Sequence, residues 1–241
     1  MAELIYQQII KKIKKQIFAQ EFADMKLPDE RSLAEHYRVS RSTIKRALNH
    51  MAQEGIIFKK RGSGTFINPL YLKNNTVFNY DSSSNLGITD SFQHNGQKPK
   101  IKVLDFKVIP ATKELQQDLF LEEGEFVYEI IRLRLFDETA FMIETGYIPI
   151  KLLPDLKKAD LSHSIFNLVE KDLKQAVTKS FMSVYAEPSN QKDQELLKLA
   201  PTEPIGVMEG IFFLDNGTPF EFSKMRLHYR YMKYNSFVTV N

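Results

Sequence analysis

Apolar residues recur at helical spacing at the start of the chain. An isoleucine stands at every fourth position from Ile5 to Ile17, and four lysines lie between positions 11 and 15. This spacing predicts an amphipathic helix with one apolar stripe, for which we expect Ile5, Ile9, Ile13 and Ile17 to face inward.

Two more helices are predicted between Pro28 and Gly55. Pro28 interrupts the first pattern, and Asp29 is a good N-cap for a second helix. Ser40 is a good N-cap for a third helix, which Gly55 ends as a C′ residue would. The residues expected to face inward are Leu33, Ala34 and Tyr37 in the second helix and Ile44, Ala47, Leu48 and Met51 in the third.

A short hairpin is predicted directly after the third helix. The runs "IIFKK" and "TFI" are separated by the glycine-containing stretch "RGSG", which is typical of two strands joined by a tight turn. Three helices and a hairpin, with only "RV" between the second and third helices, indicate a winged helix-turn-helix domain over residues 1–68, mainly α with a β-hairpin wing.

The remainder of the chain indicates a second domain of a different class. Residues 69–75 are predicted as a linker, and residues 76–241 as an α+β domain with a largely antiparallel sheet, since several strands are joined by hairpin signals such as Asn-Gly. The predicted strands are "IKVLDFKVIP", "EFVYEIIRLRLFD", "TAFMIETGYIP", "GVMEGIFFLD", "TPFEFSKMRLHY" and "SFVTV", and helices are expected at 111–121, 164–171 and 190–199.

Charge is distributed unevenly between the two predicted domains. Residues 1–68 hold 13 Lys and Arg against 7 Asp and Glu, although the whole chain has 33 against 30. A basic head on a mildly acidic body favours a polyanionic partner for the head, although a solvated basic face is the plainer alternative. The chain has no cysteine and no apolar run of about 18 residues, so we expect a cytoplasmic protein with no disulfide and no membrane segment.

The third helix carries the strongest candidates for DNA contact. Its apolar residues fix which side is buried, so Arg41, Ser42 and Lys45 must project from its N-terminal end and outer side, the part that enters the major groove in helix-turn-helix proteins. The other candidates are Thr43, Arg46, which can also point sideways, Arg31, which can instead pair with Glu35, and the hairpin-tip residues Arg61, Gly62 and Gly64.

The same region resembles a known family. The order and spacing of "LPDERSLAEHYRVSRSTIKRAL", "EGII" and "RGSGTF" are similar to the DNA-binding domain of the GntR family of bacterial transcription regulators. The resemblance implies that operator DNA is contacted by Arg31, Arg41, Ser42, Thr43, Lys45 and the wing around Gly62 and Gly64.

The second domain contains a candidate anion site. Arg132 and Arg134 are two residues apart in a predicted strand and so share one face of the sheet. Glu144, from the partner strand of the hairpin, and Glu221 can lie near them, and Ser164 precedes a predicted helix whose N-terminus favours a phosphate. A solvated sheet face with exposed arginines is the alternative.

This second domain resembles the UTRA effector-binding domain of HutC-type GntR regulators, which shares its fold with chorismate lyase. The similar segments are "IIRLRLFD", "IETGYIP", "LSHSIFNLVE" and "PIGVMEGIFFLDNGTPFEFS". The resemblance implies that Arg132, Arg134 and Ser164 hold an acidic or phosphate group and that Glu144 and Glu221 hold the polar remainder of the ligand, with Thr89 as a further contact. The run after Glu221 departs from the family pattern, and Tyr229 or His228 is the candidate to replace the pocket tyrosine expected there. Sugar phosphates are the expected effectors, and a non-phosphorylated carboxylate is the alternative.

The predicted function is therefore a ligand-responsive regulator that represses transcription. Its expected partners are double-stranded operator DNA and a small effector. A homodimer is implied, because operator half-sites one helical turn apart need two heads. An enzyme is disfavoured, because the sequence has no nucleophile elbow and no metal-ligand spacing, and no catalytic, metal or cofactor site is predicted. A non-specific architectural DNA binder would hardly need the second domain.

Overall fold

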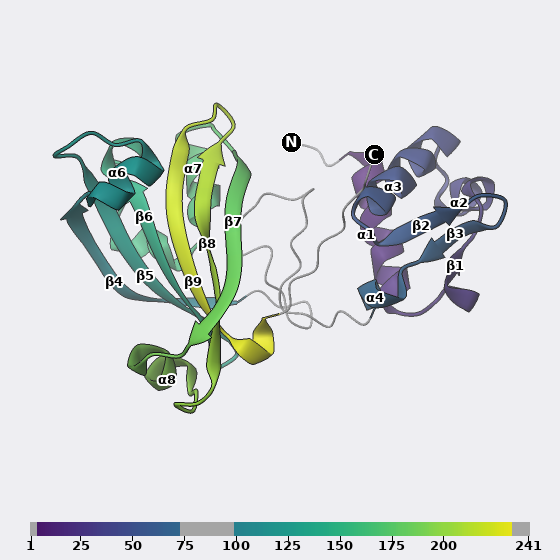
Figure 1. The fold of residues 1–241 in the computed structure, drawn as a ribbon. Helices are drawn as coiled ribbons and strands as arrows, with labels where there is room; N and C mark the ends of the chain where they lie inside the picture. Colours follow the sequence, from purple (N-terminus) through teal and green to yellow (C-terminus); the bar gives the residue numbers. More distant parts are fainter. Residues whose placement is uncertain (1–3, 73–98, 233–241) are drawn as a thin grey trace. The chain divides into compact units, whose positions relative to one another are not determined.

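The structure is a computed structural model, and it describes residues 4–72 and 99–232 (Figure 1). These residues form two compact units, an N-terminal unit and a C-terminal unit, each described here by itself. The predicted effector residue Thr89 and the predicted strand "SFVTV" lie outside the described residues.

The N-terminal unit has the predicted helix-turn-helix and wing. Its elements are α1 (Ile5–Phe18), the 3₁₀ turn η1 (Ala23–Met25), β1 (Lys26–Leu27), α2 (Glu30–Tyr37), α3 (Arg41–Gln53), β2 (Ile57–Lys60), β3 (Gly64–Ile67) and α4 (Pro69–Leu72). The hairpin strands β2 and β3 pair antiparallel, and β1 adds to the outer side of β3. The short strand β1 was not predicted.

The apolar stripe of α1 differs from the prediction by one residue. Ile9, Ile13 and Ile17 are buried as expected, but Ile5 is exposed and Ile10 is buried instead. Ile5 is the first residue of the helix and extends past the core, whereas Ile10 lies beside the buried stripe at the 3.6-residue period. All four apolar residues predicted for α3 are fully buried.

Side-chain caps set the starts of α2 and α3. Asp29 accepts hydrogen bonds from the backbone N–H groups of Arg31 and Ser32, and Ser40 accepts one from the N–H of Thr43. These bonds satisfy donors that a helix start otherwise leaves unpaired. The region predicted as a linker begins with the helical turn α4, whose Tyr71 and Leu72 pack against the core of this unit.

The C-terminal unit is an antiparallel α+β domain, as predicted. Its six strands are arranged in the order β4-β5-β6-β9-β8-β7, and every neighbouring pair is antiparallel. The strands are β4 (Lys100–Pro110), β5 (Phe126–Phe136), β6 (Thr139–Pro149), β7 (Val177–Pro188), β8 (Pro204–Leu214) and β9 (Pro219–His228), and the helices are α6 (Lys113–Leu119), α7 (Ile165–Asp172) and α8 (Gln191–Leu197), with 3₁₀ turns η2 (Ile150–Leu152), η3 (Lys158–Ser162) and η4 (Tyr229–Tyr231).

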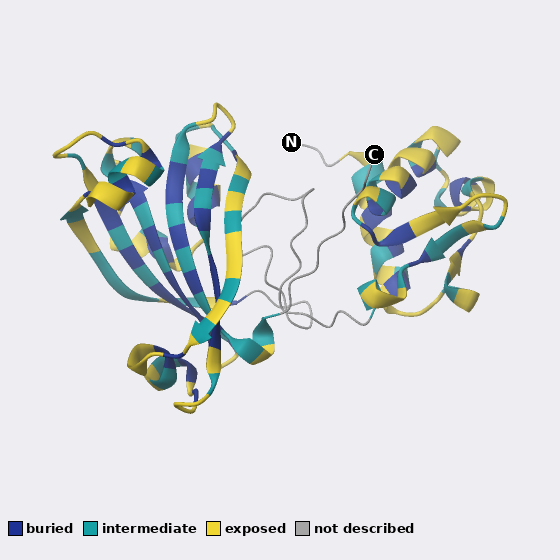
Figure 2. Cartoon of the chain, in the orientation of Figure 1, coloured by how far each residue is buried: buried dark blue, intermediate teal, exposed yellow. Residues whose placement is uncertain are grey.

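Helices cover both faces of this sheet. The main core lies between one sheet face and the segment from η2 to α7, and it includes Phe141, Phe212 and Phe220 from the strands with Phe166 from α7. The opposite face packs against α6 and α8 in two smaller clusters. The edge strand β7, which was not predicted, is largely exposed (Figure 2).

Candidate nucleic-acid interface and buried arginine–glutamate site

The N-terminal end of α3 presents cations to solvent. Arg41 and Lys45 are exposed, and neither side chain makes an ion pair or hydrogen bond with the described residues. The buried residues of α3 hold the opposite side of the helix in the core, so these two cations cannot turn inward. This is the geometry that the helix spacing predicts, and it leaves both side chains available to a phosphate or a base edge.

Hydroxyl groups cluster at the same helix end. The Ser40 hydroxyl lies 2.8 Å from the hydroxyls of both Ser42 and Thr43 while it caps the helix. Ser42 is exposed and Thr43 is half-buried. Since each hydroxyl can donate one bond and accept two, this cluster retains capacity for a phosphate oxygen at the helix N-terminus.

Two other predicted DNA contacts have partners within the head. The guanidinium of Arg31 lies 3.0 Å from Glu35, and Arg46 lies over the ring of Tyr6 in α1 with 4.2 Å between its Cζ and the ring centroid. The Arg31 pair is exposed and therefore weak, so a phosphate can compete for it. Arg46 is directed toward α1, which is the sideways orientation that the sequence left open.

The wing depends on two glycines with positive φ. Gly62 has φ +73° and Gly64 has φ +119°, so side chains are disfavoured at both positions. A Cβ atom on Gly64 would also lie 2.8 Å from Cε of Lys26. Arg61 is exposed at the tip, beside the exposed Lys59 and Lys60 of β2, so the tip presents cations on a backbone that can approach a polyanion closely.

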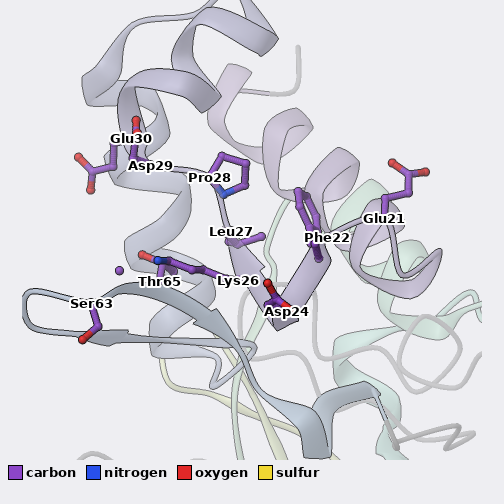
Figure 3. A pocket seen from close by; sticks show the side chains of 12 residues that line it. Glu21, Phe22, Asp24, Lys26, Leu27, Pro28, Asp29, Glu30, Ser63 and Thr65 are labelled. Carbon is purple, nitrogen blue, oxygen red and sulfur yellow. The ribbon is translucent and has the colours of Figure 1, made fainter.

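A groove of about 690 Å³ lies between the hairpin and the start of α2 (Figure 3). Its lining includes the carboxylates of Glu21, Asp24, Asp29 and Glu30 but only one cation, Lys26. The excess of carboxylates in this lining makes the groove unsuited to phosphate groups. The exposed cations at the N-terminal end of α3 and at the hairpin tip, Arg41, Lys45 and Arg61, are not among the residues that line this groove.

The predicted anion site of the C-terminal unit is a buried ion cluster. Arg132 of β5 is directly opposite Glu144 of β6, and their Nε and Oε2 atoms are 2.9 Å apart. Arg134 donates from Nη2 to both oxygens of Glu144, at 3.0 and 3.3 Å. Exposure is 3% for Arg132 and 1% for Arg134, Glu144 and Glu221, so the alternative of a solvated sheet face was wrong.

Ser164 lies at the edge of this cluster. It is the N-cap of α7, and its hydroxyl accepts the N–H of Asn167. One Nη atom of Arg132 donates to the carbonyl of the preceding residue, His163, at 3.4 Å. The structure therefore brings the residue before α7 to the Arg132 guanidinium, while the predicted role of the Ser164 hydroxyl at a phosphate stays a prediction.

Glu221 completes the cluster from β9. Its Oε1 atom lies 2.4 Å from the position that a Cβ atom on Gly146 would occupy, so only glycine leaves room for this carboxyl group. Burial, reinforced by the charge of Glu144, raises the pKa of Glu221 to about 8. Burial alone would raise the pKa of Glu144 too, but Arg132 and Arg134 outweigh it, so the pKa of Glu144 lies below its usual value.

The positive charge of this cluster is only partly balanced. Two guanidiniums contact Glu144, whose pKa lies below its usual value, whereas burial and the charge of Glu144 raise the pKa of Glu221 and so disfavour its ionised form. Glu221 Oε1 and the hydroxyl of Ser223 are also buried and make no hydrogen bond of good geometry among the described residues, although the Ser223 hydroxyl is close enough to lower the pKa of Glu221. Buried polar atoms are seldom left unpaired, so this part of the cluster has capacity for a further hydrogen-bond partner.

Comparisons with known proteins agree with both halves of this description. Residues 5–67 match the model of bacterial regulatory proteins of the gntR family, and residues 94–233 match the UTRA domain. The chain belongs to the GntR family of transcription regulators. GmuR of Bacillus subtilis strain 168 is 33% identical over 93% of this chain and 92% of its own length.

Two further relatives extend over nearly the whole chain. MngR of Escherichia coli K12, named as the repressor of a mannosyl-D-glycerate transport and metabolism system, is 28% identical over 91% of this chain and 90% of its own length. The crystal structure of the regulator YydK from Bacillus subtilis is 27% identical, with a TM-score of 0.79 over 98% of this chain and all of the other. GntR regulators bind operator DNA and respond to effectors, and the family and these relatives are transcription regulators.

Tyr229 is not brought to the cluster. Its hydroxyl donates to Glu203 at 2.7 Å, and its ring packs with Leu197 and Leu199 on the sheet face opposite Arg132. The sequence suggested Tyr229 because a pocket tyrosine was expected after Glu221. The strand β9 ends at His228, and η4 then turns the chain so that this side chain reaches the α8 side.

Ser223 is the residue that the sequence reasoning missed. It is fully buried, two residues after Glu221 on the same strand, and so shares its face. The alternation in "FEFSKM" was a usable signal, because Glu221 and Ser223 occupy the positions of one face.

Among the described residues, no group of His, Asp and Glu has the geometry of a metal site, and no helix is long and apolar enough to cross a membrane.

The pKa of Glu221 predicts a pH dependence of stability. Between its ordinary pKa of 4.5 and about 8, the folded state holds a proton that the unfolded state releases, so this group's contribution to stability is lost as pH rises through that window. We expect the free energy of unfolding of the wild type, measured by urea titration, to fall from pH 5 to pH 8 by roughly 1 kcal/mol per pH unit more than that of Glu221→Gln. Glu138→Gln, at an exposed carboxylate, is the control and should follow the wild type. Equal slopes for the wild type and Glu221→Gln would show that Glu221 is ionised in the folded protein.

Proposed function

We propose that the protein is a homodimeric repressor whose operator affinity is changed by a small anionic metabolite, a sugar phosphate, bound at the arginine–glutamate cluster. The observation that carries the proposal is the burial of two guanidiniums around Glu144, together with the buried oxygens of Glu221 and Ser223, which make no hydrogen bond of good geometry among the described residues. A ligand with one anionic end and several hydroxyls supplies what both features lack.

The phosphate end fits the side of the cluster beside α7. Arg132 offers guanidinium donors there, and Ser164 offers a hydroxyl at the start of an eight-residue helix. The partial positive charge of the helix N-terminus adds to the charge of the guanidiniums, so the two together suit a dianion. Glu221 as a neutral acid can both donate to and accept from a sugar hydroxyl.

A non-phosphorylated carboxylate remains the second candidate. A guanidinium binds a carboxylate as well as a phosphate, and MngR is named for a system that handles mannosyl-D-glycerate, a sugar acid. A screen that compares each sugar with its phosphate ester and its acid distinguishes the two candidates.

On the DNA side, we infer that Arg41 and Lys45 make the principal contacts of each head, because they are the exposed cations of α3 that lack partners among the described residues. Ser42, Thr43, Arg61, Gly62 and Gly64 would support them near the phosphates, with Arg31 and Arg46 at the periphery. Effector binding would favour a spacing of the two heads that no longer matches two half-sites.

The effector proposal is tested by thermal shift followed by operator titration. A phosphate ester present at a free concentration of 100 times its Kd should raise the free energy of unfolding of the C-terminal unit by about 2.7 kcal/mol. The same ligand should weaken operator binding by the full chain. If neither phosphate esters nor sugar acids shift the transition, the cluster does not bind this class of ligand.

Ser164→Ala tests where the phosphate lies. Loss of one hydrogen bond to a charged ligand should weaken the effector about 10- to 100-fold, at about 1.5–3 kcal/mol for such a bond. Ser162→Ala is a matched control, because Ser162 lies two residues away and bonds to the carbonyl of Ala159. Calorimetric titration of both variants with the same ligand decides the point, and an equal loss of affinity in both would remove Ser164 from the site.

A further inference from the structure

The hairpin of β2 and β3 is anchored in the core of the N-terminal unit at its base. Ile57 and Ile67 are directly opposite each other and are both buried in that core. Beyond this pair, the three remaining residues of β2 are exposed. A two-stranded hairpin is marginally stable at best by itself, so the distal half of the hairpin, residues 59–65, needs further contacts to keep one direction.

Open space separates this distal half from α2. The groove of about 690 Å³ is lined by Ser63, Gly64 and Thr65 of the hairpin and, across from them, by Asp29 and Glu30 at the start of α2 (Figure 3). Packed side chains therefore do not fix the angle between the hairpin and this helix. The direction of the hairpin depends instead on polar contacts that reach from it to the helices.

Lys59 makes two such contacts. It shares a face of β2 with the buried Ile57, because side chains alternate along a strand, so this face is directed to the helices. Its Nζ atom donates to Oδ1 of Asn49 at 2.9 Å and lies 3.6 Å from Oε1 of Glu30. Lys59 thus connects the hairpin to both helices of the helix-turn-helix, to α3 through Asn49 and to α2 through Glu30.

The neighbouring cations make no equivalent connection. The side chains of Lys60 and Arg61 are exposed and form no ion pair or hydrogen bond with the described residues. Lys26 lies over the ring of Phe66 at 5.7 Å, but it belongs to β1, which pairs with β3, and so it does not link the hairpin to a helix. Among the described residues of the distal half, Lys59 is the one whose side chain bonds to α2 or α3.

Asn49 places this connection on the side of α3 that carries the proposed DNA contacts. Arg41, Lys45 and Asn49 are four residues apart in turn, so they follow one side of the helix. The row of residues that begins with the two exposed cations therefore ends at the side chain that holds Lys59.

We propose that Lys59 is a positioning residue that sets the direction of the wing relative to α3, so that Arg61 at the tip and Arg41 at the helix end meet one operator half-site together. This role rests on the proposed DNA contacts of the two arginines. The ammonium group of Lys59 has two partners in the head, so we assign it no DNA contact of its own. A wing that already has its direction loses less conformational freedom on binding.

Hydrogen exchange of the full chain tests the effect on the wing without DNA. Lys59→Met removes both contacts, so the amide groups that bond across the hairpin should exchange roughly 3- to 10-fold faster. Lys60→Met is the matched control, because it removes the same charge from the next residue and should exchange like the wild type. Lys59→Arg keeps a charged donor and should restore most of the protection. Equal exchange in Lys59→Met and the wild type would overturn the proposal.

Operator binding tests the positioning itself. Arg61→Ala should weaken binding about 10-fold in the wild type but less than about 3-fold in the Lys59→Met background, because a tip without a fixed direction contributes less. In the Lys60→Met background, Arg61→Ala should have its full effect. Asn49→Ala should likewise change little once Lys59 is replaced. Gel-shift titration on an operator selected from a random DNA library measures these affinities.

The possible failures are distinguishable. If Lys59→Met and Arg61→Ala weaken binding by independent factors, Lys59 does not position the tip, and the proposed function is left intact. A salt slope that Lys59→Met reduces by about 0.9 per head would in that case make Lys59 a phosphate contact. If Arg61→Ala has no effect in the wild type while Arg41→Ala does, the wing does not contact the operator, and the positioning role is wrong together with that contact.

Discussion

Replacing Arg41 with alanine is expected to lower operator affinity roughly 30- to 10⁴-fold. A guanidinium that contacts a base edge or a phosphate from the end of a recognition helix contributes about 1–3 kcal/mol, and the proposed dimer would lose that contact twice. Arg41 is exposed, and its side chain has no partner among the described residues, so the substitution removes a DNA contact without disturbing the fold. Gel-shift titration on an operator selected from a random DNA library measures the loss.

Arg46→Ala is the matched control for this experiment. It removes the same charge from the same helix, but its guanidinium lies over the ring of Tyr6. We expect it to weaken operator binding less than about 10-fold, mainly through the general field of the head. Both variants should keep the wild-type thermal transition and effector shift. If Arg46→Ala weakened operator binding as much as Arg41→Ala does, the proposal that the main DNA contact comes from the side of α3 that carries Arg41 would be wrong.

The salt dependence then identifies the kind of contact. If Arg41 binds phosphate, Arg41→Ala should reduce the log–log salt slope by about 0.9 per head and weaken all sequences alike. If Arg41 instead binds a guanine base, Arg41→Ala should lose the preference for one base pair at one position of each half-site, while weak non-specific binding remains. Repeating the titration at two salt concentrations with the operator and a scrambled duplex separates these outcomes.

The helices of the head could be predicted from sequence because local signals agreed there. Ser40 and Asp29 are caps that act within three residues, and the four apolar positions of α3 all face one side. Ile5 was the exception, since periodicity cannot tell whether the first turn of a helix still lies over the core.

The edge strand β7 could not be predicted in the same way. Its apolar residues occur on both faces, as Phe181 and Tyr185 on one and Met182 and Val184 on the other. A strand with a single buried face shows alternation, but an edge strand half-exposed on both faces has no such constraint. The sequence of β7 therefore shows no alternation of apolar and polar residues, and this is the signal from which a strand is predicted.

The buried arginine–glutamate cluster was predictable in part. Arg132 and Arg134 followed from their spacing, and Glu144 followed from the hairpin that joins β5 to β6. The approach of Glu221 depends on the pairing of β6 with β9, which are about 70 residues apart in the chain and have no local signal for their register. The prediction that Tyr229 lies in this cluster was wrong, because the 3₁₀ turn directly after β9 directs its side chain to the opposite face of the sheet.

Glu144→Gln is expected to destabilise the C-terminal unit by about 3–5 kcal/mol, because it removes the ionised partner that both buried guanidiniums contact. Glu221, whose pKa the charge of Glu144 helps to raise, offsets only part of this loss when it ionises. In a chain of this size the melting temperature should fall by roughly 10 °C or more, as scanning calorimetry can measure. Glu138→Gln breaks the exposed pair with Lys100 and should change stability by less than about 0.5 kcal/mol. A Glu144→Gln protein as stable as this control would mean that the cluster is solvated.

The combined variant Arg132→Met, Arg134→Met and Glu144→Leu distinguishes a role of the cluster in folding stability from a role in effector binding. Replacing a whole buried ion cluster with apolar residues of similar volume is often neutral or stabilising, so we expect this variant to recover most of the stability that Glu144→Gln loses. It should nevertheless show no thermal shift with the effector and should bind operator DNA without responding to it. The cluster is then retained for the ligand, since an apolar core would hold the sheet as well. A combined variant that still responds to the effector would place the ligand away from these residues.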